Sequence, residues 1–150
     1  AGLFSTAWDL SIFARVMLNG GALPPCQPEV ASGVPCARPR GDPARVVRPE
    51  TVERYTTRFD DSSSRALGWD TPSGRSSAGD YFTAAAFGHT GFTGTSIWMD
   101  PELDLFVVLL TNRVNPTRAN TAHVPLRREV HDRAARAITD RRVEPRGGAP

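Results

Sequence analysis

The stretch His89-Thr90-Gly91-Phe92-Thr93-Gly94 contains the residues of this chain that are best suited to chemistry. His89 supplies a titratable ring and Thr90 a hydroxyl, and glycines on both sides let a ligand or another backbone approach closely. If the stretch lies at an open strand edge, its unpaired N–H groups can stabilise a developing oxyanion. These groups together suit a carbonyl compound with an adjacent anionic group. The structural alternative is a glycine-rich bulge in which His89 only supports the fold.

Helical periodicity predicts three helices around this stretch. Residues 5–18 form an amphipathic pattern that Ser5 or Thr6 can cap and that Asn19-Gly20-Gly21 ends. Pro49 to Thr57 predicts a short second helix, because proline suits the first helical position. A C-terminal helix is predicted from an apolar stripe formed by Leu126, Val130, Ala134, Ala137 and Ile138.

Three short strands are also expected, at residues 66–69, 95–99 and 105–111. The last two flank the turn at 100–104 and should form an antiparallel hairpin. Because residues 105–110 are all apolar, we expect that strand to be buried on both faces. Three short strands cannot cover both of its faces, so we expect further strands from a longer native chain rather than from a second copy.

The composition fits one globular domain and argues against two classes of partner. The 150 residues are 39% hydrophobic and 23% charged, with a net charge of +2. All 18 basic residues are arginine, but acidic residues are interspersed among them, so nucleic acid is not an expected partner. No apolar run approaches the roughly 20 residues that cross a bilayer, so no membrane span is expected in this segment.

Residues 22–47 are rich in proline and read as a surface insertion within a domain of residues 1–142, followed by a flexible tail at 143–150. Cys26 and Cys36 lie in this insertion, and their spacing leaves a local disulfide and two unpaired thiols equally open.

Two further groups of residues have side chains of the types that form sites. His123, His131 and Asp132 have a spacing that fits no common metal site, and we expect them on a solvated helix face. The three tryptophans are expected in the core rather than in a binding platform. No metal and no organic cofactor is therefore expected.

The order of several segments resembles the C-terminal part of the β-lactamase-related serine hydrolases, which include class C β-lactamases, DD-peptidases and esterases. His89-Thr90-Gly91 is similar to their third motif, Lys-Thr-Gly or His-Thr-Gly, on the strand beside the active site. The resemblance spans nearly the whole chain apart from the insertion. The other matching segments are Ala1 to Leu10, Arg48 to Thr51, Leu67 to Trp69, Thr95 to Asp104, Phe106 to Arg113 and the C-terminal helix.

This resemblance implies an α+β, β-lactamase/transpeptidase-like fold, with an antiparallel sheet flanked by helices and without its N-terminal part. It implies that His89 holds substrate and tunes proton transfer, and that Thr90, with Gly91 beside it, binds the substrate's carboxylate or an equivalent group. The Phe92 N–H would supply half of an oxyanion hole. Asn112 and Arg113 would lie near the rim of the site.

The chain departs from the family's pattern in its other two motifs. It has no lysine and hence no Ser-x-x-Lys nucleophile motif, and it has no Tyr-x-Asn. Both motifs precede the first matching segment in the family. We therefore expect the C-terminal segment of an exported bacterial serine hydrolase, secreted, periplasmic or in the cell envelope, that is inactive alone and is completed by the missing N-terminal part of its own chain.

The expected substrates of the whole enzyme are amides or esters such as β-lactams, D-amino-acid peptides or small esters, cleaved through an acyl-enzyme. The alternative is a non-catalytic substrate-binding or peptidoglycan-sensing module with a degenerate site.

Overall fold

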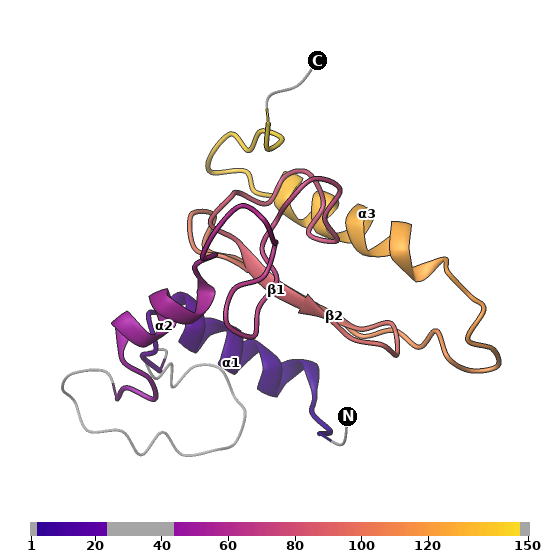
Figure 1. The fold of residues 1–150 in the computed structure, drawn as a ribbon, viewed down its shortest axis with the longest axis horizontal. Coiled ribbons are helices and arrows are strands. Elements are labelled where there is room, and N and C mark those ends of the chain that lie inside the picture. Colours follow the sequence, from indigo (N-terminus) through magenta and orange to yellow (C-terminus); the bar gives the residue numbers. More distant parts are fainter. Residues whose placement is uncertain (1–2, 24–43, 148–150) are drawn as a thin grey trace.

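The computed structural model describes residues 3–23 and 44–147 and has an α+β architecture, as predicted. One antiparallel sheet lies between α1 on one face and α3 on the other, with α2 beside α1 (Figure 1). None of the helices in the described part of the chain has the length and apolarity to cross a bilayer. In chain order, the elements are α1 (Ala7–Leu18), α2 (Pro49–Thr56), β1 (Phe87–Thr90), β2 (Ser96–Asp100), β3 (Leu105–Leu109) and α3 (His123–Arg136).

The sheet has the strand order β1-β2-β3, so β1 and β3 are its edges within the described residues. β2 and β3 form the antiparallel hairpin that the sequence predicted, with Trp98 opposite Val107. The expectation of a β3 buried on both faces was wrong for these residues. All five of its positions are half-buried, because β3 here is an edge strand.

The α1 face of the sheet is closed by apolar side chains. α1 begins where the Thr6 hydroxyl accepts from the Asp9 N–H, and it ends at Asn19, as predicted. Its buried residues are Ala14, Val16 and Met17, of which Ala14 and Met17 lie against α2 and the sheet. The amphipathic pattern is confirmed only in part, because Phe13, which the sequence also placed on the apolar side, is 43% exposed. The buried members of this cluster are Ala14, Met17, Val52, Phe87 and Met99.

The α3 face is closed differently, and here the predicted apolar stripe was wrong. The side chains that α3 buries are Arg127, His131 and Ala135, spaced by four residues. Leu126, the first residue of the predicted stripe, is 43% exposed. The helix is rotated about its axis relative to the prediction because two polar side chains find backbone acceptors inside, so their burial is compensated by hydrogen bonds.

The strand expected at 66–69 is a tight turn. The Ala66 N–H donates to the Trp69 carbonyl at 3.0 Å, and Gly68 has a φ of +85°, which an extended strand cannot accommodate. Asp70 then pairs with Gly88 of β1 through both of its backbone groups.

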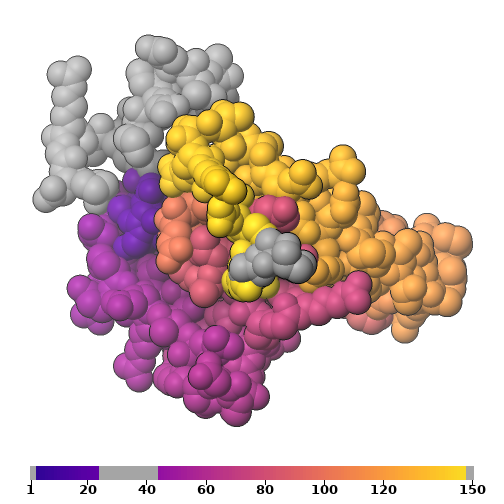
Figure 2. Space-filling model, turned by 90° about the horizontal axis from the view of Figure 1, so that it is seen from above, coloured from indigo at the N-terminus to yellow at the C-terminus, as the bar shows by residue number. Residues whose placement is uncertain are grey.

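The segment expected to be a flexible tail contacts the rest of the protein as far as it is described. Arg146 donates to the carbonyl oxygens of Phe82 and Gly79 at 2.7 and 3.1 Å, and Val143 packs against the apolar cluster around Trp98. The space-filling view shows this yellow segment lying against the loop that precedes β1 (Figure 2).

The two ends of the predicted insertion meet in an isolated antiparallel bridge between Ala22 and Arg45. The Leu23 N–H donates to the Ala44 carbonyl at 2.9 Å. Residues 24–43 lie outside the described residues, and with them Cys26 and Cys36.

Candidate active site

The predicted motif lies where a ligand can reach it, on the edge strand β1. Gly88 uses its outward N–H and C=O groups to bond Asp70, at 2.9 and 2.7 Å. Two residues further, Thr90 turns to the same edge, and in the described part of the chain its hydroxyl has no hydrogen-bond partner. The pairing with Asp70 therefore ends before the motif, and the edge at Thr90 is open.

His89 is held in one tautomer by its two neighbours. The Arg65 Nη1 lies 2.8 Å from His89 Nε2, and the Thr90 carbonyl lies 2.9 Å from His89 Nδ1. Because a guanidinium can only donate, Nε2 must accept, and the ring proton is then on Nδ1 and donates to Thr90. The positive charge of Arg65 is thereby placed directly beside the motif.

The structure does not bring the His89 and Thr90 side chains together. Side chains alternate along a strand, and His89 shares a face with Phe87, which packs towards α1. The Thr90 side chain lies on the opposite face of the sheet, where its cross-strand neighbour is Ser96. The two residues meet only at the strand edge, through the hydrogen bond between the ring and the Thr90 carbonyl.

The turn that joins β1 to β2 is clamped from α3 by Arg127. Its Nη2 donates to the carbonyls of Gly91 and Thr95, both at 2.7 Å, and its Nε donates to Gly94 at 3.1 Å. Arg127 is only 6% exposed. Burial, and after it the nearby Arg113, lowers the pKa of Arg127 from its ordinary value.

Arg113 holds the other side of the same turn. Its Nε donates to the Phe92 carbonyl at 2.7 Å, and its backbone N–H donates to the Thr93 carbonyl at 2.9 Å. Its guanidinium also lies over the Phe92 ring, 4.5 Å from the centroid. The expected neighbour Arg113 is thus in contact with the turn, whereas the Asn112 side chain caps the next turn by accepting from Val114 and Asn115.

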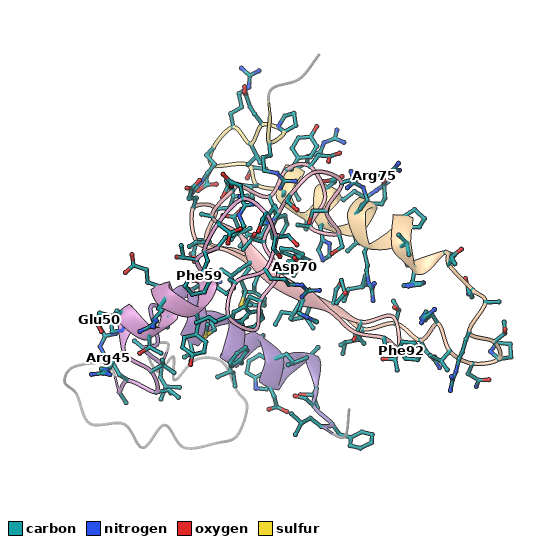
Figure 3. The ribbon with its side chains drawn as sticks, in the orientation of Figure 1. Arg45, Glu50, Phe59, Asp70, Arg75 and Phe92 are labelled. Carbon is teal, nitrogen blue, oxygen red and sulfur yellow. The ribbon has the colours of Figure 1, made fainter. Side chains whose placement is uncertain are left out.

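The result is a turn whose five carbonyl oxygens, from residues 91 to 95, are all engaged, while the Phe92 N–H has no acceptor within residues 3–23 and 44–147. Phe92 lies at the tip of the turn, far from α2 (Figure 3), and it is 63% exposed. This is the arrangement expected of a fixed N–H donor that awaits an acceptor.

Two glycines make this tight turn possible. A Cβ on Gly91 would lie 2.1 Å from the Thr95 Oγ1. At Gly94 the φ is +111°, and a Cβ there would lie 2.7 Å from the Thr111 Oγ1 and 3.2 Å from its carbonyl oxygen. Gly91 therefore serves the backbone geometry of the site rather than contributing a chemical group.

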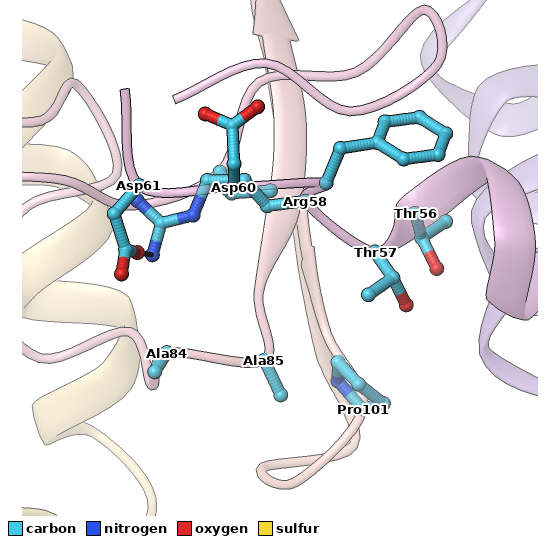
Figure 4. A pocket seen from close by; sticks show the side chains of 10 residues that line it. Thr56, Thr57, Arg58, Asp60, Asp61, Ala84, Ala85 and Pro101 are labelled. Carbon is cyan, nitrogen blue, oxygen red and sulfur yellow. Dashed lines mark ion pairs between the residues drawn. The ribbon is translucent and has the colours of Figure 1, made fainter. Parts of the chain in front are cut away.

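A hollow in the described surface lies elsewhere, away from the motif. It has a volume of about 530 Å³ and is lined by residues 56–61 together with Thr71, Ala84, Ala85 and Pro101 (Figure 4). Pro101 follows β2 at the end opposite the 91–95 turn. This hollow therefore includes none of the predicted site residues.

The expectation that His131 is solvated was wrong, and its neighbourhood is structural. His131 is fully buried and bonds the Ser77 carbonyl through Nδ1 at 2.8 Å. The Asp132 carboxylate accepts from the backbone N–H of Asp80 at 2.6 Å. Within the described residues no three His, Cys, Asp or Glu side chains gather as a metal site would require.

Two residues of this site, Arg65 and Arg127, were missed by the sequence analysis. The contact between Arg65 and His89 spans 24 residues, and nothing in the local pattern marks it. Arg127 has a weak signal, because Arg127, His131 and Ala135 recur every four residues and so share one side of α3.

The chain belongs to the β-lactamase family, whose sequence model it matches over residues 1–132. It is 30% identical over 116 residues to an Escherichia coli K12 protein named "Putative D-alanyl-D-alanine carboxypeptidase", a match that covers 75% of this chain and 23% of that protein. A Salmonella gallinarum protein of the same name is 32% identical over 124 residues, covering 80% and 24%. The chain thus spans about a quarter of the length of these relatives. Its family is one of serine hydrolases.

Proposed function

We propose that this chain forms one wall of a serine hydrolase site that cleaves amides or esters through an acyl-enzyme. The observation that carries the proposal is the 91–95 turn, in which every carbonyl is engaged and the exposed Phe92 leaves its N–H available. A donor fixed in this way is worth most where negative charge develops on a carbonyl oxygen, because it needs no reorganisation during the reaction.

In this proposal the Phe92 N–H is one donor of the oxyanion hole, and the N–H of the nucleophilic serine is the other. The serine and its lysine base belong to a segment outside these 150 residues, since the chain contains no lysine. The exposed apolar side chains of Trp8 and Ile12, four residues apart on α1, support this. A pair of this kind suits a surface that packs against further protein.

Substrate recognition is assigned to the strand edge before the turn. The Arg65 guanidinium, held against His89, supplies a positive charge where the family's Lys-Thr-Gly variant has a lysine. The Thr90 hydroxyl, with no partner in the described part of the chain, is available to a carboxylate beside the reacting carbonyl. D-amino-acid peptides, β-lactams and small acyl esters have suitable groups, and the first of these would place the enzyme in the cell envelope.

The first test compares the 150-residue chain with the full-length gene product. The short chain should give no burst with nitrocefin or p-nitrophenyl acetate, whereas the full-length product should form a stoichiometric acyl-enzyme that mass spectrometry detects. An acyl-enzyme on the short chain would refute the proposal that the nucleophilic serine lies outside these 150 residues. Tight binding of a D-Ala-D-Ala peptide or a penicillin by the full-length product without acylation would support the non-catalytic module instead.

The second test addresses His89 in the full-length gene product. His89→Ala should reduce kcat/KM by about 1–3 kcal/mol of transition-state stabilisation, because it removes the group that positions Arg65 and the Thr90 carbonyl. Arg58→Ala, in the hollow at the far end of the sheet, is the control and should leave the kinetics unchanged. Unaltered kinetics in His89→Ala would remove that residue from the site.

A further inference from the structure

Arg127 is a buried cation that no carboxylate neutralises among the described residues. The ion pairs in that part of the chain involve six other arginines, and Arg127 instead binds three backbone carbonyls. Burying a charge costs several kcal/mol unless hydrogen bonds compensate it. Apolar side chains at the same place would close the α3 face at lower cost. Packing alone therefore does not explain why an arginine occupies this position.

One of its three acceptors belongs to the same peptide group as the candidate oxyanion donor. The Gly91 carbonyl and the Phe92 N–H are the two ends of one planar amide. A hydrogen bond that fixes the direction of the carbonyl therefore fixes the direction of the N–H on its far side. Donation from a cation to that carbonyl also polarises the amide, which makes its N–H a stronger donor.

We propose that Arg127 is a positioning residue of this hydrolase, which orients and polarises the Gly91–Phe92 amide so that its N–H stabilises the oxyanion. The Nη2 group bridges the Gly91 and Thr95 carbonyls, which lie on either side of the turn, and Nε holds Gly94. A planar fork with donors at fixed spacing can span these carbonyls, whereas an ammonium group is a single point of donation. Arg127 itself touches no reacting atom.

This inference rests on the proposed function, and its test separates the two. The full-length gene product is compared as wild type, Arg127→Lys, Arg127→Met and Arg133→Met. Arg133 lies on the same helix, is largely exposed and pairs with Glu129, so it is the matched control. If the wild type forms no acyl-enzyme, the proposed function fails, whatever the variants do.

For an active wild type, we expect Arg127→Met to reduce kcat by about tenfold to a hundredfold with KM within about twofold, since the loss of one oxyanion donor costs about a hundredfold or more. Arg127→Lys should recover only part of this loss, and Arg133→Met should behave as wild type. An ester substrate should lose more rate than the matching thionoester, because only the oxygen ester uses the N–H donor fully. Folded Arg127→Lys protein with wild-type kcat would overturn the proposal, and so would equal losses on ester and thionoester.

A second measurement requires no activity. The hydrogen-bonded amides of the turn are those of Gly91 and Gly94, which donate to the Thr95 and Gly91 carbonyls. Hydrogen exchange followed by mass spectrometry should show faster exchange of these two amides in Arg127→Lys than in wild type, while the peptides of β2 and α1 stay unchanged. If the Gly91 and Gly94 amides exchange as slowly as in wild type, Arg127 does not hold the turn, and the inference fails even where the protein is a hydrolase. If amide exchange in Arg127→Met is faster throughout the protein, that variant has lost its fold. The proposal is then tested with Arg127→Lys alone.

Discussion

The two faces of the sheet are closed by different kinds of interaction. On the α1 side the buried contacts are apolar, around Met17, Phe87 and Met99. The α3 side has an apolar cluster around Trp98 as well, but Arg127 and His131 are buried beside it and bond backbone carbonyls. Apolar contacts are non-directional and confer stability, whereas hydrogen bonds fix direction. The comparison teaches that the 91–95 turn of the candidate site is held from the face that uses the directional kind.

Met99→Ala should have the largest effect, because it opens a cavity on the apolar face. Met99 is fully buried in the cluster with Ala14, Met17 and Phe87. We expect the free energy of unfolding to fall by about 2–5 kcal/mol in urea denaturation. Phe59→Ala is the control, since Phe59 is 66% exposed and should change stability little. A loss below about 1 kcal/mol in Met99→Ala would mean that the α1 face is not the main apolar core.

Gly94→Ala tests the packing of the turn held by α3. The new methyl meets the Thr111 side chain and carbonyl, and the φ of +111° is strained for any L side chain. The two effects together should cost about 2–4 kcal/mol in the same denaturation experiment. Gly68→Ala isolates the strain, because Gly68 has a φ of +85° and nothing within 4 Å of a new Cβ.

Gly68→Ala should therefore cost only about 1–2 kcal/mol. Equal losses at the two glycines would show that contact with Thr111 contributes nothing, which would weaken the view of a closely packed turn.

A pH titration of stability distinguishes the buried polar face from the apolar one. Burial lowers the pKa of His131, partly opposed by its bond to Ser77 and by Asp132, so the folded protein keeps this ring neutral. Between that lowered pKa and the unfolded value of about 6.5, the unfolded chain binds more protons. Stability should therefore fall as the pH drops below about 6.5, by at most about 1.4 kcal/mol per pH unit.

His131→Gln keeps a donor towards the Ser77 carbonyl but does not titrate, so it should reduce the dependence of stability on pH. The measurement is the urea unfolding midpoint of both proteins at about pH 7.5 and about pH 5.5. His123, whose pKa is also lowered by burial, is present in both proteins, so its contribution cancels in the difference. An identical pH slope in the variant would contradict the assignment.

Arg133→Met should have the smallest effect of the series. The Arg133 Nε lies 2.7 Å from the Glu129 Oε1, but both side chains are more than half exposed. Exposed pairs at this helical spacing contribute about 0.3–0.5 kcal/mol, so the unfolding free energy should change by no more than that. A loss above about 1 kcal/mol would mean that the outer side of α3 contributes to stability, and the contrast between the two sides of this helix would be lost.

The sequence predicted those parts of the fold in which one local signal dominates. α1 and α2 followed from periodicity, proline and capping residues, and the β2–β3 hairpin followed from two apolar runs around a turn. The orientation of α3 could not be predicted in this way, because Arg127 and His131 are buried by acceptors far along the chain. At residues 66–69 a short apolar segment led to the wrong prediction of a strand. The left-handed backbone of Gly68 is incompatible with an extended strand there.

For the candidate site the sequence indicated the stretch but not its supports. The types and spacing of His89, Thr90 and the glycines marked it, and the structure places it at an open edge. The tautomer of His89 and the engaged carbonyls of the turn depend on Arg65 and Arg127, which reach it across 24 and 36 residues. Only the folded backbone reveals such partners.

The bridge between Ala22 and Arg45 has a practical consequence for engineering. Since the Leu23 N–H bonds the Ala44 carbonyl, the two ends of any segment grafted between these residues lie side by side, and lengthening a flexible graft costs little, about 0.6 kcal/mol for each doubling of its length. A fluorescent reporter or an affinity tag grafted there would be held at both ends by the existing bridge between Ala22 and Arg45. It would report on the protein without any alteration to the sheet or to the helices on either side.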